Sequence, residues 1–282
     1  MRIGLIGIDS SHAEDFLRLL NAESRYPGHR VTALCGPDPV RLATLAGASN
    51  LATTQNPADL VGTIDTAIIG DRHGGLHRAH ALPFIEAGLP VFIDKPLTCS
   101  VADAEAILSA ARRSGSSIAS ASAVRWQPDV AALAREIERL GGPLEVTTTG
   151  PYDPTSQYGG SFFYGIHAVE LALQLAGSEI ASVAVEATTN EVSARCRVGT
   201  TAVTVRLRRP TAGEDIPFAA NVVCAAGRAH RTIGLDADYM SHVLDRFIGM
   251  LETGQPPMSA AELLAPVHLM ATIDEAIRGR AS

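Results

Sequence analysis

The chain has 282 residues, of which 46% are hydrophobic and 19% are charged, a composition typical of a globular protein with a substantial core. This length exceeds the usual size of one domain, so two domains are expected. A formal net charge of −7 argues against a nucleic-acid partner, because it leaves no basic surplus to neutralise phosphates. Apolar runs fall short of the ~18 residues of a membrane span. The four cysteines lack CxxC spacing, which argues against a disulfide framework or a structural zinc site.

Residues 1–123 alternate between strand and helix patterns. The first strand pattern begins at Arg2, which leaves no room for a signal peptide and predicts a cytoplasmic protein. A capping box of Ser11 and Glu14 is expected at the first helix. Strands are expected at residues 2–8, 31–35, 66–69, 91–93 and 118–123, and helices at residues 11–21, 39–46, 77–87 and between Ser100 and Gly115. This alternation predicts an α/β fold with a Rossmann-like, doubly wound parallel sheet.

Residues 124–282 follow a different order. Helices are expected at residues 129–140 and 165–176 on either side of a strand at 144–149. Five strand patterns then follow with tight turns between them, at residues 182–188, 192–198, 202–208, 219–225 and 230–235. The chain ends with helices at residues 238–252 and 259–278. This half is expected to be an α+β domain with a mainly antiparallel sheet, and its last helix is a candidate to pack back on the first domain.

Lys95 is the leading candidate for a catalytic residue. A short apolar run delivers it, between Asp94 and Pro96, to the end of an expected buried strand. Ligands bind where the strands of a parallel sheet end, and a lysine there can donate a proton, hold a negative charge or act as a nucleophile. A surface lysine without a role is the alternative.

Other polar residues follow strands of the same sheet: Asp9, His12, Asp71, His73 and His77. They are expected to meet Lys95 at one crevice, which His167 from the second domain would complete. His73 and His77 have the spacing of a chelating pair on a helix, but the two glycines between them oppose a helix, so no metal site is predicted. On the helix at 165–176, Glu170 is placed to orient the imidazole of His167, although a histidine without a role is also consistent.

Four short motifs follow one another along the chain: Gly4-Leu5-Ile6-Gly7, Asp94-Lys95-Pro96, Val124-Arg125-Trp126-Gln127-Pro128, and Gly159-Gly160 followed by His167. Together they resemble the Gfo/Idh/MocA family of nicotinamide-dependent sugar and polyol oxidoreductases, over essentially the whole chain. The resemblance implies NAD or NADP as cofactor, a small-molecule substrate, and a homodimer or homotetramer. It also implies that Lys95 and His167, with Glu170 beside the latter, face the substrate hydroxyl.

The expected binding residues follow from the motifs and the resemblance together. A cofactor would lie against Gly7, Asp9, Ser10, Ser11, His12, Asp38, Asp71, His77, Asp94 and Pro96. A substrate would lie against Arg125, Trp126, Tyr158 and Tyr164, the tyrosines coming from a glycine-rich loop or its end. Alternating apolar residues at 202–207 suggest that the open sheet face pairs two copies.

The chain departs from the family pattern at several positions. Asp9 falls on the second glycine of the dinucleotide fingerprint and His12 on the third. A carboxylate about 4 Å from a phosphate costs on the order of 4 kcal/mol at an effective dielectric of roughly 20. Gly36 replaces the acid that would hold the ribose, which leaves Asp38 as the candidate, and Phe163 replaces the acid expected four residues before His167. Capping of the next helix is an alternative role for Asp9.

Three functions are compatible with this pattern. The leading one is an NAD(P)-dependent oxidoreductase acting on a sugar, polyol or related hydroxy compound. The alternatives are a cofactor-independent isomerase or lyase, and a non-catalytic ligand-binding protein on the same scaffold. Dinucleotide binding by the purified protein distinguishes the first from the others.

Overall fold

The computed structural model describes residues 1–47 and 51–281, which form two compact units. The first unit comprises Met1–Thr98, Ala102–Ser120 and Val243–Met258, and the second holds the remaining segments. The C-terminal segment of the first unit contains most of helix α7 (Ser241–Thr253), whereas the last helix, α8 (Ala260–Ala281), belongs to the second unit.

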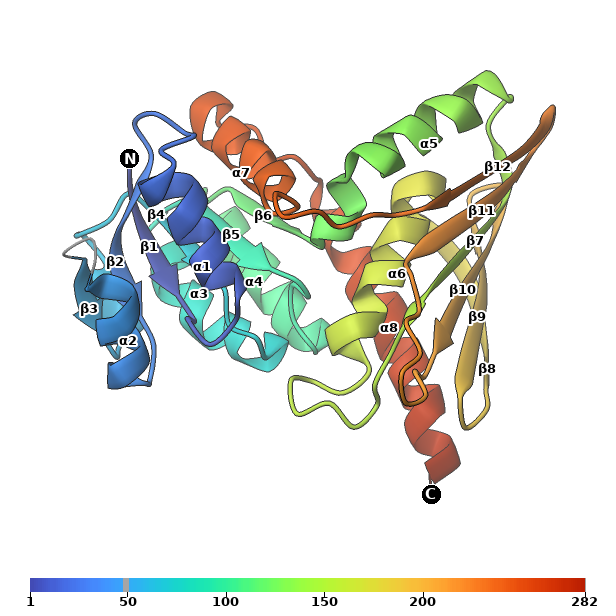
Figure 1. The fold of residues 1–282 in the computed structure, drawn as a ribbon, viewed down its shortest axis with the longest axis horizontal. Helices are drawn as coiled ribbons and strands as arrows, with labels where there is room; N and C mark the ends of the chain where they lie inside the picture. Colours follow the sequence, from blue (N-terminus) through green and yellow to red (C-terminus); the bar gives the residue numbers. More distant parts are fainter. Residues whose placement is uncertain (48–50, 282) are drawn as a thin grey trace. The chain divides into compact units, whose positions relative to one another are not determined.

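The first unit is built on a six-stranded parallel sheet in the order β3-β2-β1-β4-β5-β6 (Figure 1). The strands are β1 (Arg2–Ile6), β2 (Arg30–Cys35), β3 (Ala52–Thr54), β4 (Thr66–Ile69), β5 (Val91–Asp94) and β6 (Ile118–Ala121). Strands β4, β5 and β6 are buried along their whole length because helices cover both faces of the sheet. The doubly wound sheet expected from the sequence is confirmed. Only the short, half-exposed edge strand β3 lacked a recognisable pattern.

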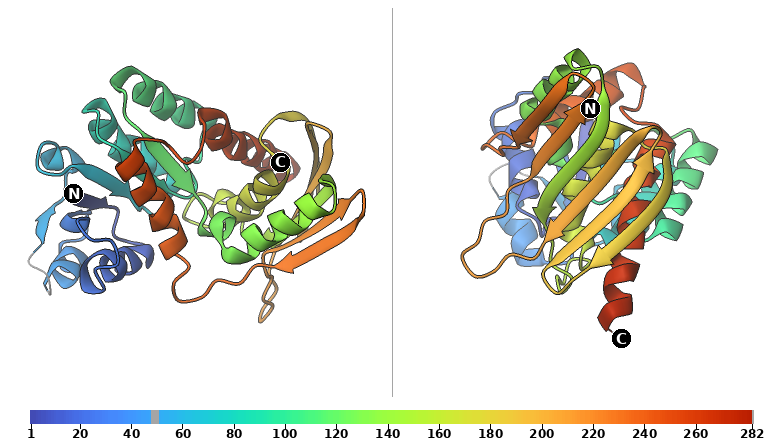
Figure 2. Two further views of the ribbon diagram at one scale, coloured as in Figure 1. Left: turned by 90° about the horizontal axis from the view of Figure 1, so that it is seen from above. Right: turned by 90° about the vertical axis from the view of Figure 1, so that its right-hand side faces the viewer.

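Helices flank this sheet on two sides (Figure 2). They are α1 (His12–Leu17), which continues as a π-helical turn (Arg18–Ala22), and α2 (Pro39–Ala46), α3 (His77–Glu86), α4 (Val101–Ser114) and α7. The ring of Phe92 in β5 lies 6.2 Å from that of Phe16 in α1 and 5.7 Å from that of Phe247 in α7. An aromatic core therefore joins α1 and α7 to one face of the sheet.

The second unit contains a six-stranded sheet in the order β12-β11-β7-β10-β9-β8, in which β7 and β10 are parallel and the other pairs antiparallel. Its strands are β7 (Pro143–Pro151), β8 (Ile180–Ala187), β9 (Glu191–Val198), β10 (Thr201–Arg208), β11 (Ala219–Cys224) and β12 (Gly227–Thr232). Helices α5 (Pro128–Arg139), α6 (Phe162–Ala176) and α8 lie on one face (Figures 1 and 2). The expected mainly antiparallel sheet is confirmed.

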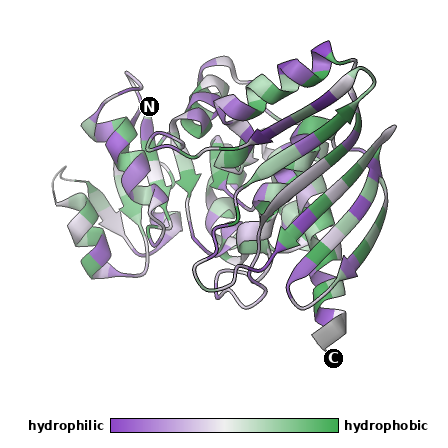
Figure 3. Cartoon of the chain, turned by 45° about the vertical axis from the view of Figure 1, so that its right-hand side comes forward, coloured by the Kyte–Doolittle hydropathy of each residue, from purple (hydrophilic) through white to green (hydrophobic). Residues whose placement is uncertain are grey.

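Strand β10 shows how this sheet divides its two faces. Val203, Val205 and Leu207 are buried, while Thr204 and Arg206 between them are more exposed. Hydrophilic and hydrophobic residues alternate along strands of this sheet in Figure 3. The apolar residues that suggested a pairing surface therefore belong to the core, and that argument for pairing was wrong. No helix in the described parts of the chain combines the length and apolar character needed to cross a lipid bilayer.

Candidate functional site

The turn after β1 depends on Gly7. Its φ is +77°, and a Cβ at this position would lie 2.3 Å from the main-chain nitrogen of Asp71. Only glycine fits such a turn without moving the chain that follows β4. The N–H of Gly7 donates to the carbonyl of Cys35 at 2.9 Å, which ties the end of β2 to the same turn.

Asp9 does not cap α1. Oδ1 of this exposed residue accepts the N–H of Arg72 at 3.1 Å, so its carboxylate reaches toward the loop after β4. The helix begins after Ser11, whose side chain makes no capping bond, so the expected Ser11 capping box is wrong. Ser10 accepts the N–H of His12 at 3.2 Å instead. A carboxylate thus stands at the second glycine position of the dinucleotide fingerprint.

Asp94 is a buried carboxylate bonded to two neighbours. Nδ1 of His12 lies 2.6 Å from its Oδ2, and the N–H of Lys95 donates to Oδ1 at 2.8 Å. Burial on its own would raise the pKa of Asp94, but the positive charges of His12 and Lys95 and these hydrogen bonds outweigh it and lower the pKa to about 2. The carboxylate of the Asp-Lys-Pro motif is therefore ionised at neutral pH.

This lowered pKa predicts an acid-dependent loss of stability. A carboxyl with a depressed pKa in the folded state stabilises the protein above its unfolded-state pKa, and this stabilisation is lost as pH falls from about 4 toward 2. Urea unfolding should show the free-energy difference between wild type and Asp94→Asn shrinking by on the order of 2 kcal/mol across this range.

Asp65→Asn is the matched control, because Asp65 pairs with Arg2 on the surface, where solvent screens the pair. Its difference from wild type should change less with pH. An equal pH dependence in both variants would contradict the stabilisation assigned to Asp94.

His77 joins the loops after β4 and β5. It is fully buried, with Nδ1 2.8 Å from the carbonyl oxygen of Pro96 and Nε2 2.9 Å from that of Asp71. The sequence suggested that His77 binds a cofactor. Both ring nitrogens instead lie against main-chain carbonyl oxygens, which leaves neither nitrogen open to a direct cofactor contact. Its neighbour His73 accepts the N–H of Gly75 at Nδ1. His77 instead holds the turn that carries Lys95.

Lys95 is 7% exposed, a buried residue rather than a surface lysine. Asp71 on the neighbouring loop is 4% exposed and lies 2.8 Å from Nδ1 of His80, and this hydrogen bond raises the pKa of His80. Asp38 is further along the sheet and caps α2, where Oδ1 accepts the N–H groups of Val40 and Arg41. One of the two carboxylate oxygens of the residue predicted to hold a ribose therefore caps a helix.

In the second unit, His167 is bonded to a serine that sequence reasoning missed. Oγ of Ser122 lies 2.5 Å from Nδ1 of His167. Glu170, expected to orient the imidazole, accepts the N–H of Ser122 at 2.8 Å and so supports the histidine through that serine. A polar residue directly after the buried strand β6 was the signal that could have identified Ser122.

Arg125 is buried beside these residues. It is 4% exposed, and its Nε and Nη1 have no hydrogen-bond partner within the described chain, while Nη2 lies 3.9 Å from a carboxylate oxygen of Glu262. Burial lowers the pKa of Arg125, and the charges of Glu170 and Glu262 oppose that shift. Two donor nitrogens without acceptors are available to a ligand or water. The neighbouring Trp126 is half-buried.

The loop before α6 brings aromatic residues together. The ring of Phe163 lies 5.2 Å from that of Tyr158 and 4.7 Å from that of Tyr164. Tyr164 is 41% exposed and borders a pocket of about 510 Å³. Tyr152, which the sequence did not single out, also lines this pocket, and burial raises its pKa. Charged residues complete the lining: Asp153, Arg209, Glu214 and Asp215.

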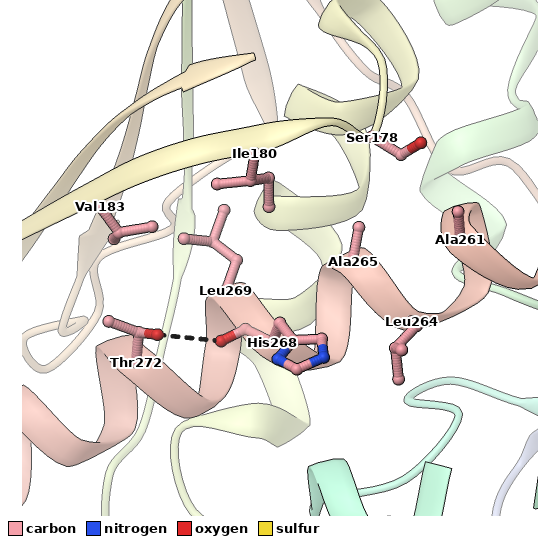
Figure 4. A pocket seen from close by; sticks show the side chains of 9 residues that line it. All are labelled: Ser178, Ile180, Val183, Ala261, Leu264, Ala265, His268, Leu269 and Thr272. Atoms are coloured by element: carbon pink, nitrogen blue, oxygen red, sulfur yellow. Dashed lines mark hydrogen bonds between the residues drawn. The ribbon is translucent and has the colours of Figure 1, made fainter. Parts of the chain in front are cut away.

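A second pocket, of about 360 Å³, lies between β8 and α8 (Figure 4). Ile180, Leu264 and Leu269 make it largely apolar, and His268 is its one ionisable lining residue. None of the residues predicted for catalysis lines this pocket. The clusters of polar side chains around Lys95 and around His167 therefore lie outside this pocket.

Residues 1–121 match the Gfo/Idh/MocA family model, described as an oxidoreductase family with an NAD-binding Rossmann fold. This matched segment covers 121 of the 282 residues, and it includes the glycine turn after β1 and the buried lysine after β5. The N-terminal part of the chain is therefore similar to this family.

Known relatives extend this comparison. The chain is 32% identical over 111 residues to inositol 2-dehydrogenase 3 from Saccharopolyspora erythraea, a match that spans 39% of this chain and 32% of that protein. The structure resembles myo-inositol dehydrogenase from Lactobacillus casei, solved with NAD(H) and myo-inositol, with a TM-score of 0.83, 17% identity and coverage of 99% and 94% of the two chains. It also resembles myo-inositol 2-dehydrogenase from Lactobacillus plantarum, with a TM-score of 0.82, 14% identity and coverage of 99% of this chain and 97% of that chain. These two likenesses establish a shared fold.

Proposed function

We propose that the protein is a cytoplasmic NAD(P)-dependent oxidoreductase that oxidises a CH–OH group of a sugar, polyol or related hydroxy compound. The observation that carries the proposal is Lys95, held buried at the end of β5 within a domain of an NAD-binding family. Lys95 is also the one lysine among the 23 lysines and arginines of the chain. Lys95 therefore supplies the only lysine amine of the sequence.

The N-terminal unit fits a dinucleotide only in part. We propose that the turn at Gly7 and the polar residues Ser10, Ser11 and His12 hold the diphosphate, while the exposed carboxylate of Asp9 repels it. The nicotinamide supplies a hydride acceptor when it is bound. We therefore propose weak dinucleotide binding, with the preference between NAD and NADP open because Gly36 provides no ribose contact.

Within this proposal, Lys95 and His167 are the groups that handle the proton of the substrate hydroxyl. Glu170 and Ser122 support His167. The substrate would be bound by the residues that the sequence predicted for this role: Arg125, Trp126, Tyr158 and Tyr164. Aromatic faces with a guanidinium suit a polyhydroxylated compound, which presents both C–H surfaces and hydroxyl acceptors.

The proposed function is tested by incubating the purified protein with NAD or NADP and a panel of inositols, sugars and polyols, and following cofactor reduction. Reduction with at least one substrate is expected. An alternative isomerase or lyase would exchange substrate C–H for solvent deuterium without any cofactor being reduced. A ligand-binding protein would bind a substrate with neither reaction, and either result would refute the oxidoreductase proposal.

We also propose a homodimer or homotetramer formed through the sheet face opposite α6 and α8. Polar and small side chains such as Thr147, Thr204 and Asn221 cover that face, together with charged residues including Arg206. Light scattering at micromolar concentration should give twice or four times the chain mass of 29.6 kDa. A single-chain mass would contradict this part of the proposal.

A further inference from the structure

The hydroxyl group of Ser122 has few hydrogen-bond partners. It is fully buried directly after β6. Its Oγ accepts the N–H of Val124 at 3.1 Å and lies 2.5 Å from Nδ1 of His167. Within the described chain these are the two hydrogen bonds of the hydroxyl, since Glu170 takes the main-chain N–H instead. Nδ1 of His167 is therefore the acceptor available to the Ser122 O–H.

This arrangement decides which nitrogen of the neutral imidazole carries the proton. A neutral ring has one N–H and one accepting nitrogen. If Nδ1 carried the hydrogen, it would donate to Oγ, and the buried Ser122 O–H would be left without an acceptor, which costs free energy. If Nδ1 accepts from Ser122, both the Ser122 O–H and Nδ1 are satisfied, and the hydrogen of the neutral ring lies on Nε2.

We propose that Ser122 is a positioning residue that holds neutral His167 with its proton on Nε2. His167 then acts as a hydrogen-bond donor to the substrate oxygen, and the proton released by the substrate goes to the amine of Lys95. The first part stands on the contacts of Ser122 alone, and the second rests on the proposed function. Phe163 stands four residues before His167, where the family pattern places an acid. In this chain, Ser122 is the residue that contacts Nδ1 of His167.

Charged and aromatic groups surround Ser122 and His167. Glu170 on the same helix as His167 accepts the N–H of Ser122, the charge of Glu170 acts on Arg125, and the ring of Phe218 packs 5.0 Å from the imidazole. Asp94 and His12 are the charged groups beside Lys95.

The oxidation step balances with these roles. The C–H bond breaks and its electron pair leaves with the hydrogen as a hydride to the oxidised nicotinamide dinucleotide. The O–H bond breaks, its proton passes to the uncharged Lys95 amine, and the oxygen electrons form the C=O bond. The Nε2–H of His167 remains in place and stabilises the negative charge that develops on the oxygen.

Long-range 1H–15N NMR of the full-length, 15N-labelled protein tests the proton position directly. At about pH 8.5, some two units above the ordinary pKa of an imidazole, the neutral form is observed. His167→Gln identifies the signal among the nine histidines. We expect Nδ1 to show the shift of an unprotonated nitrogen and Nε2 that of a protonated one. A hydrogen on Nδ1 would overturn the proposal, whatever the enzyme's activity.

Ser122→Ala should give a mixture of the two neutral forms and lower kcat roughly tenfold, with a smaller change in KM, because the ring loses the bond that orients it. Ser122→Thr keeps the hydroxyl and should restore the Nε2 form. Ser120→Ala makes the same change at a buried serine two residues earlier, within β6, and should alter neither readout. If Ser122→Ala does not fold, the wild-type and Ser122→Thr spectra still decide the matter.

The single lysine allows the proton acceptor to be observed as well. Protein made with 13C-labelled lysine gives one side-chain signal, which reports the charge of Lys95. The rate of substrate oxidation should rise with pH as this signal shows loss of the proton. A rate that follows His167 while Lys95 stays charged would overturn the division of roles. A wild-type protein without turnover would refute the proposed function and leave the NMR result on Ser122 unaffected.

Discussion

Replacing Lys95 with methionine is expected to lower kcat/KM by about 10²–10⁴-fold, the usual contribution of a positioned acid or base. Methionine keeps most of the aliphatic stem of this buried side chain, so the core around β5 should stay filled. The amine, to which we assign the proton of the substrate hydroxyl, is lost. Steady-state kinetics with the substrate found in the screen measures the effect.

The stability of the variant must be followed at the same time. Lys95 contributes to lowering the pKa of Asp94, so its removal takes a positive charge away from a buried carboxylate. Lys95→Arg is the control, because it keeps the positive charge but cannot lose its proton at ordinary pH. It should be as inactive as Lys95→Met. Full activity in either variant would show that Lys95 is not the proton-transfer group.

Asp9→Gly is expected to strengthen binding of NAD(H) by two to three powers of ten, because it removes a charge repulsion on the order of 4 kcal/mol. Asp9 is exposed and contributes one hydrogen bond, from the N–H of Arg72, so the fold should survive. Calorimetry on both proteins at low salt measures the change in affinity. Asp9→Asn separates charge from shape, since it removes the charge and keeps an acceptor for Arg72.

Gly36, at the position of the ribose acid, is expected to respond differently. Gly36→Asp would restore the missing ribose acid, but a Cβ there would lie 2.6 Å from Cγ1 of Ile8, a side chain that is 1% exposed. We therefore expect Gly36→Asp to lower the melting temperature without a gain in affinity. Tight binding of NAD(H) by the wild type at neutral pH would contradict the argument from Asp9.

The order of the elements was accessible from the sequence because periodicity is a local property. Buried strands such as β4 and β5 appear as short apolar runs, and α2 spans residues 39–46 as its pattern predicts. The motif around Lys95 marks a strand end for the same reason. Apolar runs, caps and turns act over a few residues, so the doubly wound sheet followed by a mainly antiparallel one could be predicted without the structure.

The partners of the polar groups were decided by tertiary structure alone. His12 meets Asp94 across 82 positions of sequence, and Ser122 meets His167 across 45, distances over which periodicity carries no information. Burial decided the rest: it made Glu170 a support for Ser122 and placed both nitrogens of His77 against carbonyls. A buried polar atom must find its acceptor within the fold, and which atom lies within reach depends on packing between elements that are remote in sequence.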